Sequence, residues 1–255
     1  MKLVVLGSGS AIPDRKRSPS AYWLETAASK ILLDCSAAAL PRMLAEDLPW
    51  HELDAIWISH FHADHCGGLL PFLSSMRIAP ETAGRTKPLT ICGPRGLREL
   101  IEKLSGVNNY RLLRQSFPVD VTETEPLEEF ALTRDITAVS MKTPHTDESL
   151  ALHLRDAADT TFVYTADTAF APEIGAFARR VDLLMIEATF PNGKGAAKHL
   201  ELAEAMFLVR KADPKRAVLT HLGPDWNGID IENAAAEFSS MCPVTAAEDG
   251  LRINF

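Results

Sequence analysis

The sequence predicts an α/β fold, counted as α+β in some schemes, in which two β-rich layers are covered by helices. Short apolar runs of strand type alternate with segments whose apolar residues recur at helical spacing. In each half of the chain the strand-type runs come before the helical ones, as expected when sheets form the interior. The 255 residues, 46% of them hydrophobic, can bury a large core without disulfides or a structural metal. We therefore expect a single domain over residues 1–255.

The predicted elements follow in chain order, and each strand ends at glycine, proline or polar residues. In the first half we expect strands at Lys2–Leu6, Lys30–Asp34, Ala55–Ser59 and Leu89–Cys92, with helices at Gly68–Ile78 and Pro94–Leu104. In the second half we expect strands at Ile136–Met141, Leu150–Leu154, Thr161–Thr165, Leu183–Glu187 and Ala217–Thr220, with helices at His199–Lys211 and Ile231–Met241. Pro94 suits the first helical turn, because a missing N–H costs nothing there. The acidic stretch TETEPLEE at 122–129 predicts a solvated turn, and a linker between two halves is the alternative.

Charge and cysteine usage exclude several classes of protein. The net charge of −8 excludes a uniformly basic nucleic-acid-binding surface, although a local basic patch stays open. The four cysteines are scattered, which favours a reducing compartment over a secreted disulfide framework. The N-terminal apolar run is too short for a signal peptide, and no stretch approaches the ~20 apolar residues that span a membrane. We expect a soluble cytoplasmic protein with no membrane partner.

The most informative segment is HFHADH at residues 60–65, directly after an apolar strand and before a helix. His60, His62, Asp64 and His65 fall within six residues, and imidazole and carboxylate groups suit zinc and neighbouring transition metals. In an extended loop His60 and His62 reach toward one side, whereas Asp64 and His65 face a second position. The alternative is two surface histidines and one core histidine. Four ligand-type residues at this spacing favour a metal site.

Three further polar residues follow predicted strands, where a buried strand delivers a side chain to a cleft at the edge of the sheet. These residues are His145, Asp167 and His221. Each alone could be an ordinary turn residue, but together with the cluster they predict a site for two metal ions. Cys66 beside His65 is expected to be a small buried residue rather than a ligand. The sequence does not decide whether Trp226 lies in the core or at the mouth of the pocket.

The HFHADH segment, followed in order by His145, Asp167 and His221, resembles the metallo-β-lactamase superfamily of hydrolases. The resemblance implies an αββα four-layer sandwich. It places His60, His62 and His145 on one metal and Asp64, His65 and His221 on a second, with Asp167 bridging the two. Two divalent metal ions per chain are therefore expected. Zinc is the expected metal, with manganese or iron as alternatives that the same ligand types accept.

Further segments resemble the ribonuclease Z branch of the superfamily. The opening LGSGSAIP resembles its first strand and turn, and Arg15, Lys16 and Arg17 resemble a basic loop near the RNA 3′ end. His199, at the start of a predicted helix, resembles the histidine near the scissile phosphate. A solvated turn and an ordinary first-turn residue are the respective alternatives. The chain departs from the family at 34–39, which reads DCSAAA, and it has an acidic segment in place of the basic tRNA-gripping arm.

We therefore expect a metal-dependent phosphodiesterase resembling ribonuclease Z, acting on an RNA 3′ end, such as a tRNA precursor, or on a small or cyclic phosphodiester. A hydroxide bridging two metals would attack phosphorus. Asp64 would orient the nucleophile, His199 would protonate the leaving oxygen, and the basic loop would hold a phosphate. The resemblance also implies a homodimer. The alternatives are hydrolysis of a carbonyl substrate, such as a lactone or thioester, and a non-enzymatic metal-binding module.

Overall fold

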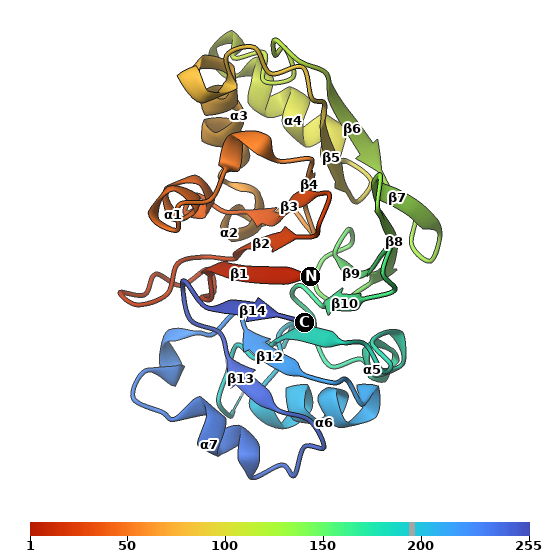
Figure 1. The fold of residues 1–255 in the computed structure, drawn as a ribbon. Coiled ribbons are helices and arrows are strands. Elements are labelled where there is room, and N and C mark those ends of the chain that lie inside the picture. Colours follow the sequence, from red (N-terminus) through yellow and green to blue (C-terminus); the bar gives the residue numbers. More distant parts are fainter. Residues whose placement is uncertain (194–196) are drawn as a thin grey trace.

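The computed structural model describes residues 1–193 and 197–255, and these form two facing β-sheets with helices on both outer sides (Figure 1). Each sheet has seven strands within the described residues. Figure 1 shows α1–α4 on one side of the sheet pair and α5–α7 on the other. The predicted αββα sandwich is confirmed.

The first sheet has the strand order β14-β1-β2-β3-β4-β5-β6. Its strands are antiparallel from β14 to β3 and parallel from β3 to β6. They are β1 (Lys2–Gly7), β2 (Ala21–Glu25), β3 (Lys30–Cys35), β4 (Ala55–Trp57), β5 (Leu89–Gly93), β6 (Val119–Glu123) and β14 (Arg252–Asn254). The helices that follow its strands are α1 (Ala39–Ala45), α2 (Ala63–Cys66), α3 (Leu69–Ile78) and α4 (Leu97–Gly106).

The second sheet has the order β13-β12-β11-β10-β9-β8-β7, parallel from β10 to β13 and antiparallel from β7 to β10. Its strands are β7 (Glu129–Thr133), β8 (Ile136–Lys142), β9 (Leu150–Asp156), β10 (Thr161–Tyr164), β11 (Leu183–Glu187), β12 (Ala217–Thr220) and β13 (Val244–Ala246). Its helices are α5 (Pro172–Phe177), α6 (Leu202–Ala212) and α7 (Ile231–Ala236). The acidic segment turns from β6 into β7 and so connects the two sheets.

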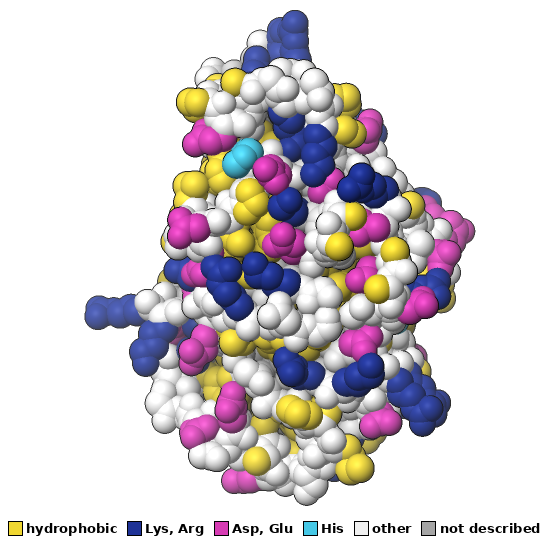
Figure 2. All heavy atoms as spheres, viewed as in Figure 1, with side chains coloured by type: hydrophobic (Ala, Val, Ile, Leu, Met, Phe, Trp, Pro, Cys, Tyr) yellow, Lys and Arg dark blue, Asp and Glu magenta, His cyan; other side chains and the backbone are white. Residues whose placement is uncertain are grey.

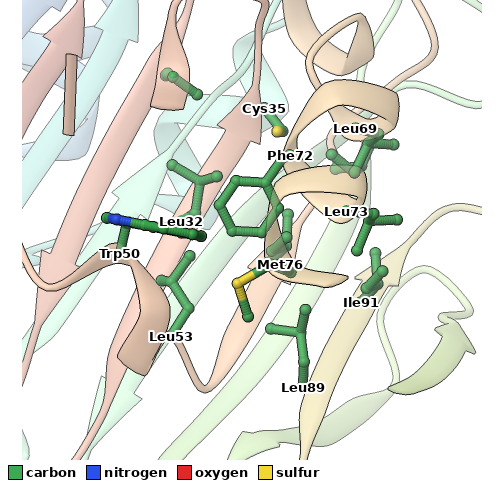
Figure 3. Close-up of a cluster of buried hydrophobic side chains, with 14 of the residues drawn as sticks. Leu32, Cys35, Trp50, Leu53, Leu69, Phe72, Leu73, Met76, Leu89 and Ile91 are labelled. Atoms are coloured by element: carbon green, nitrogen blue, oxygen red, sulfur yellow. The ribbon is translucent and has the colours of Figure 1, made fainter. Parts of the chain in front are cut away.

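Apolar side chains fill three layers, one between the sheets and one beneath each set of helices. Along β1, Leu3 and Val5 belong to the layer between the sheets, whereas Val4 and Leu6 belong to the layer beneath the first set of helices. Successive side chains of a strand point to opposite faces, so a sheet covered on both faces requires such an uninterrupted apolar run. Figure 3 shows the outer layer of the first sheet, where apolar side chains of α3 pack against the strands.

Every predicted strand coincides with an observed one within two residues at either end, but some helix starts were wrong. Helix α4 begins at Leu97, so Pro94 lies before the helix and not in its first turn. Helix α6 begins at Leu202 because Glu201 caps it through a reciprocal pair with Glu204, so His199 lies in the preceding loop. Helix α7 ends at Ala236, five residues earlier than predicted.

The fold also decides between the two positions considered for Trp226. Trp226 is fully buried and donates its Nε1–H to the carbonyl of Ala188 at 2.7 Å, which makes it a core residue. None of the described helices is long and apolar enough to cross a membrane.

Candidate metal centre

The structure brings the seven predicted metal ligands together at one edge of the two sheets. They lie on loops that follow strands, or on the short helix after β4: His60 and His62 after β4, Asp64 and His65 in α2, His145 after β8, Asp167 after β10 and His221 after β12. Parallel strands deliver the residues at their carboxyl ends to the same edge of a sheet, which is why sequence-distant side chains meet.

The ligand atoms of the seven predicted residues fall into two groups that share Asp167, and a third cluster of possible ligands, Glu187, His199 and His221, adjoins group 2 through His221. Group 1 comprises His60, His62, His145 and Asp167, and group 2 comprises Asp64, His65, Asp167 and His221. Within each group the ligand atoms lie within 4.8 Å of one another. This division is the one that the family resemblance implies.

Unpartnered atoms in these groups show that a cation fits here. His60 Nε2, His65 Nε2 and Asp167 Oδ1 are buried without a hydrogen bond of ordinary geometry within the described residues, and His65 Nε2 and Asp167 Oδ1 lie 3.2 Å apart. Burying such atoms is costly unless they bind something. Imidazole nitrogens combined with carboxylate oxygens form a donor set that suits zinc and similar divalent ions.

A buried carboxylate beneath group 2, Asp34 at the end of β3, holds the ligands in place. Its Oδ2 accepts hydrogen bonds from His65 Nδ1 (2.7 Å), Tyr164 OH (2.7 Å) and Ser59 Oγ (2.8 Å), and its Oδ1 accepts one from the Ser59 backbone N–H (2.7 Å). Because Nδ1 of His65 donates its proton to Asp34, Nε2 is the nitrogen that faces the ligand group. His60 Nδ1 lies 3.0 Å from Ser59 Oγ and is connected to Asp34 through it.

A second buried carboxylate, Glu187 at the end of β11, organises the other side of the site. It accepts the backbone N–H groups of Thr168 (2.6 Å) and Leu200 (3.1 Å) and the hydroxyl of Thr189 (2.6 Å). It also lies 3.1 Å from His199 Nδ1. Thr189 in turn accepts from His221 Nδ1 at 2.9 Å, so Glu187 fixes one ligand through Thr189.

Burial and pairing shift the pKa values of the site in opposite directions. Burial lowers the pKa of His60 to about 2, which keeps its imidazole neutral, the form that binds metals. Burial alone would also lower the pKa of His65, but the carboxylates of Asp167 and Asp34 hold it well above the usual value. The same holds for His199, whose pKa is raised because its contact with Glu187 outweighs burial.

The carboxylates of the ligand groups shift the other way. Burial alone would raise the pKa of Asp167, but His221 and His65 hold it well below the usual value. The pKa of Asp64 is likewise lowered against the effect of burial, through its contacts with His221 and His65. Both carboxylates are therefore ionised and available as ligands.

The predicted catalytic and substrate-binding residues lie at different depths. His199 is half-buried, and its ring centroid lies 4.8 Å from that of His145. Arg15 and Lys16 are exposed on the loop between β1 and β2, where Figure 2 shows dark-blue side chains projecting from the molecule. Arg17 donates to Asn227 at 3.0 Å, which joins this loop to the one that follows His221. A role of the basic loop in substrate binding stays a prediction.

Sequence reasoning assigned no role to Asp34, Glu187 or Thr189. Asp34 and Glu187 each end an apolar strand, KILLD and LLMIE. Asp167 was predicted because it follows an apolar strand, and the same pattern could have indicated Asp34 and Glu187. Thr189 carries no such signal, because its role depends on the position of His221 on the next strand.

The fold and the two ligand groups define a protein of the metallo-β-lactamase superfamily, of the ribonuclease Z-like kind. A family model described as "Anti-Pycsar protein Apyc1" matches residues 1–242. The chain belongs to this family.

Curated relatives and solved structures agree with this assignment. The probable metallo-hydrolase YhfI of Bacillus subtilis is 25% identical over 224 residues, which cover 87% of each chain, and its crystal structure superposes with a TM-score of 0.84, 24% identity and 99% coverage of both chains. The short form of human tRNase Z gives a TM-score of 0.77 at 22% identity, covering 100% of this chain and 99% of that one. A ribonuclease Z of Methanosarcina mazei is 29% identical over 154 residues, which cover 60% of this chain. This chain spans about half or less of the length of the first curated relatives it matches.

Proposed function

We propose that this protein is a metal-dependent phosphodiesterase. The observation that carries the proposal is the pair of ligand groups sharing Asp167, with His199 held beside them by Glu187. Group 1 and group 2 would each hold one divalent ion, expected to be zinc. When bound, the two ions lower the pKa of coordinated water to about 7 and neutralise charge on phosphoryl oxygens. The names ribonuclease Z and tRNase Z among the relatives support phosphodiester chemistry.

The side chains around the ligand groups supply the proton transfers. The carboxylate of Asp64 is half-buried at the edge of group 2 and orients the attacking water. His199 donates its Nδ1–H to Glu187 Oε1, which leaves Nε2 as the nitrogen that delivers a proton to the leaving oxygen. General acid catalysis of this kind contributes about 10²- to 10⁴-fold to a rate.

The surface near the site favours a small or cyclic phosphodiester over a long RNA. Residues 107–118 connect α4 to β6 by a short path, and the following turn carries Glu125 and Glu128. A polynucleotide depends on Lys and Arg contacts to its backbone, and Glu128 has the wrong sign for this while Glu125 is paired with Arg95. The basic loop at Arg15–Arg17 offers guanidinium and ammonium groups that suit a phosphate. Cleavage of an RNA 3′ end by the same site is the alternative that the test includes.

The test measures hydrolysis by zinc-loaded protein of a precursor tRNA carrying a 3′ trailer and of a panel of cyclic nucleotides. We expect His145→Ala and Asp64→Ala to abolish diester hydrolysis while circular dichroism shows a nearly unchanged fold, because each removes a ligand without opening the core. His51→Ala, which removes a histidine outside both ligand groups, serves as the matched control and keeps full activity. Turnover retained by metal-verified His145→Ala protein would overturn the proposal.

His199 discriminates the phosphodiesterase from a hydrolase of lactones or thioesters built on the same ligand groups. We expect His199→Ala to lower kcat for diester hydrolysis about 10²-fold or more. We expect groups 1 and 2 to keep their metal, because His199 belongs to neither and its own cluster with Glu187 shares only His221 with group 2. Diester turnover that His199→Ala leaves unchanged would shift the assignment to a carbonyl substrate, to be tested next with lactone and thioester panels.

A further inference from the structure

The residue between the first two ligand histidines, Phe61, is held on three sides. Its backbone N–H donates to Glu148 Oε1 at 3.3 Å, and its carbonyl accepts from the Cys66 thiol at 3.3 Å. Its ring rests on Gly96, where a Cβ would lie 3.3 Å from Phe61 Cε2 and where φ is +97°. Cys66 is thus a buried donor to the ligand loop, and it belongs to neither ligand group.

Glu148 belongs to the loop that carries His145, so its bond to Phe61 joins two ligand-bearing loops. A second bond, from the Leu150 backbone N–H to the Ser59 carbonyl (3.0 Å), joins the same loops next to it. The loop of His60 and His62 and the loop of His145 are therefore connected at Ser59 and at Phe61, on either side of His60. All three histidines belong to group 1.

His62 is the ligand that most needs this connection. It is exposed, whereas His60, His145 and Asp167 are buried. Within the described residues, the hydrogen-bonding contact of its imidazole is with His145, Nδ1 to Nε2 at 3.1 Å, and both are ligand atoms of the same group. Within the described ranges no further side chain orients the ring, so the His62 imidazole is placed by the backbone that carries it. This backbone is fixed on one side by the His62 carbonyl, which accepts from the N–H groups of His65 and Cys66, and on the other by Phe61.

We propose that Glu148 is a positioning residue for group 1, acting through the backbone N–H of Phe61 to hold His60 and His62 at the right distance from His145. The inference rests on the proposed two-metal function. Glu148 lies in neither ligand group. Its half-buried side chain borders a pocket of roughly 420 Å³, so its truncation leaves no cavity in the apolar core.

The experiment is a competition titration of zinc from a chromophoric chelator into metal-free protein, followed by the visible absorption of cobalt as a readout of ligand geometry. We expect Glu148→Ala to weaken one of two sites about 10- to 100-fold, the range seen when a residue that orients metal ligands is removed, and to leave the other site unchanged. Glu148→Gln keeps an oxygen acceptor for the Phe61 N–H and restores wild-type affinity.

Asp147→Ala is the matched control. It removes a neighbouring exposed carboxylate whose side chain makes no hydrogen bond within the described residues, so it reports the effect of charge alone and leaves both sites unchanged. Unchanged affinities in Glu148→Ala would overturn the proposal, and so would a Glu148→Gln protein as weak as Glu148→Ala. Loss of both sites together with the helical circular dichroism signal would also overturn it, because the role would then be structural. A wild-type protein that binds two zinc ions yet cleaves no diester would overturn the proposed function and leave this role standing.

Discussion

Asp34 and Glu187 are buried carboxylates at the ends of strands in different sheets. They form hydrogen bonds with different residues of the same site. Asp34 sits beneath group 2 and accepts from His65, Tyr164 and both donors of Ser59. Glu187 accepts two backbone N–H groups and bonds His199, and within the described residues it is linked to the candidate ligand His221 through Thr189. Asp34 holds candidate ligands, and Glu187 mainly holds His199, the proposed proton donor. We therefore expect changes at Asp34 to affect mainly metal binding, and changes at Glu187 to affect mainly the rate of turnover.

The largest expected effect is at Asp34. We expect Asp34→Asn to lower the free energy of unfolding by about 3 kcal/mol and to weaken metal binding, because an amide nitrogen would face buried donors and leave at least one unsatisfied. Urea unfolding of metal-free protein and zinc titration measure the two effects. Asp135→Asn is the control, since Asp135 accepts hydroxyl hydrogen bonds from Thr26, Ser29 and Thr133 in a half-buried position away from the ligand groups. If Asp34→Asn lowers the free energy of unfolding by less than about 1 kcal/mol, Asp34 is no more important for stability than Asp135.

The second expected effect, at Glu187, is smaller and concerns the rate of turnover rather than stability. We expect Glu187→Gln to lower kcat for diester hydrolysis about 10- to 100-fold while two metal ions stay bound. The glutamine amide keeps one acceptor oxygen and cannot accept from all four donors that Glu187 holds, so the orientation of His199 is disturbed. Steady-state kinetics and metal analysis of the same preparation measure both quantities. A Glu187→Gln protein that loses metal in proportion to activity would show that Glu187 acts on His221 through Thr189, and the two carboxylates would then have one role.

The ligand set was predictable because its signals are local. His60, His62, Asp64 and His65 fall within six residues of sequence, and Asp167 and His221 each follow an apolar strand. The structure brings all seven predicted ligands together, and the division into two groups agrees with the resemblance. The metal itself, and the role of the basic loop, stay predictions.

What the sequence could not predict depends on contacts between distant segments. Helix α4 begins at Leu97 and not at Pro94 because Glu123 of β6 accepts the backbone N–H groups of Gly96 and Arg98. This cap comes from a strand more than twenty residues away. Strand β6 itself was missed because its acidic end predicts a turn. The shift of His199 out of the helix was also hidden, since Glu201 takes the N-cap position that Ser or Thr occupies in the usual capping signature.

The position of group 2 across the two sheets also has a consequence for folding. Asp64 comes from the first sheet and His221 from the second, and they lie 3.4 Å apart although 157 residues separate them in the chain. Closing a loop of that length costs chain entropy before any contact repays it, and such non-local contacts slow folding. The ligand groups therefore form only after the sheets have docked. A chain that refolds from denaturant regains its capacity to bind metal no earlier than the apolar layer between the sheets closes.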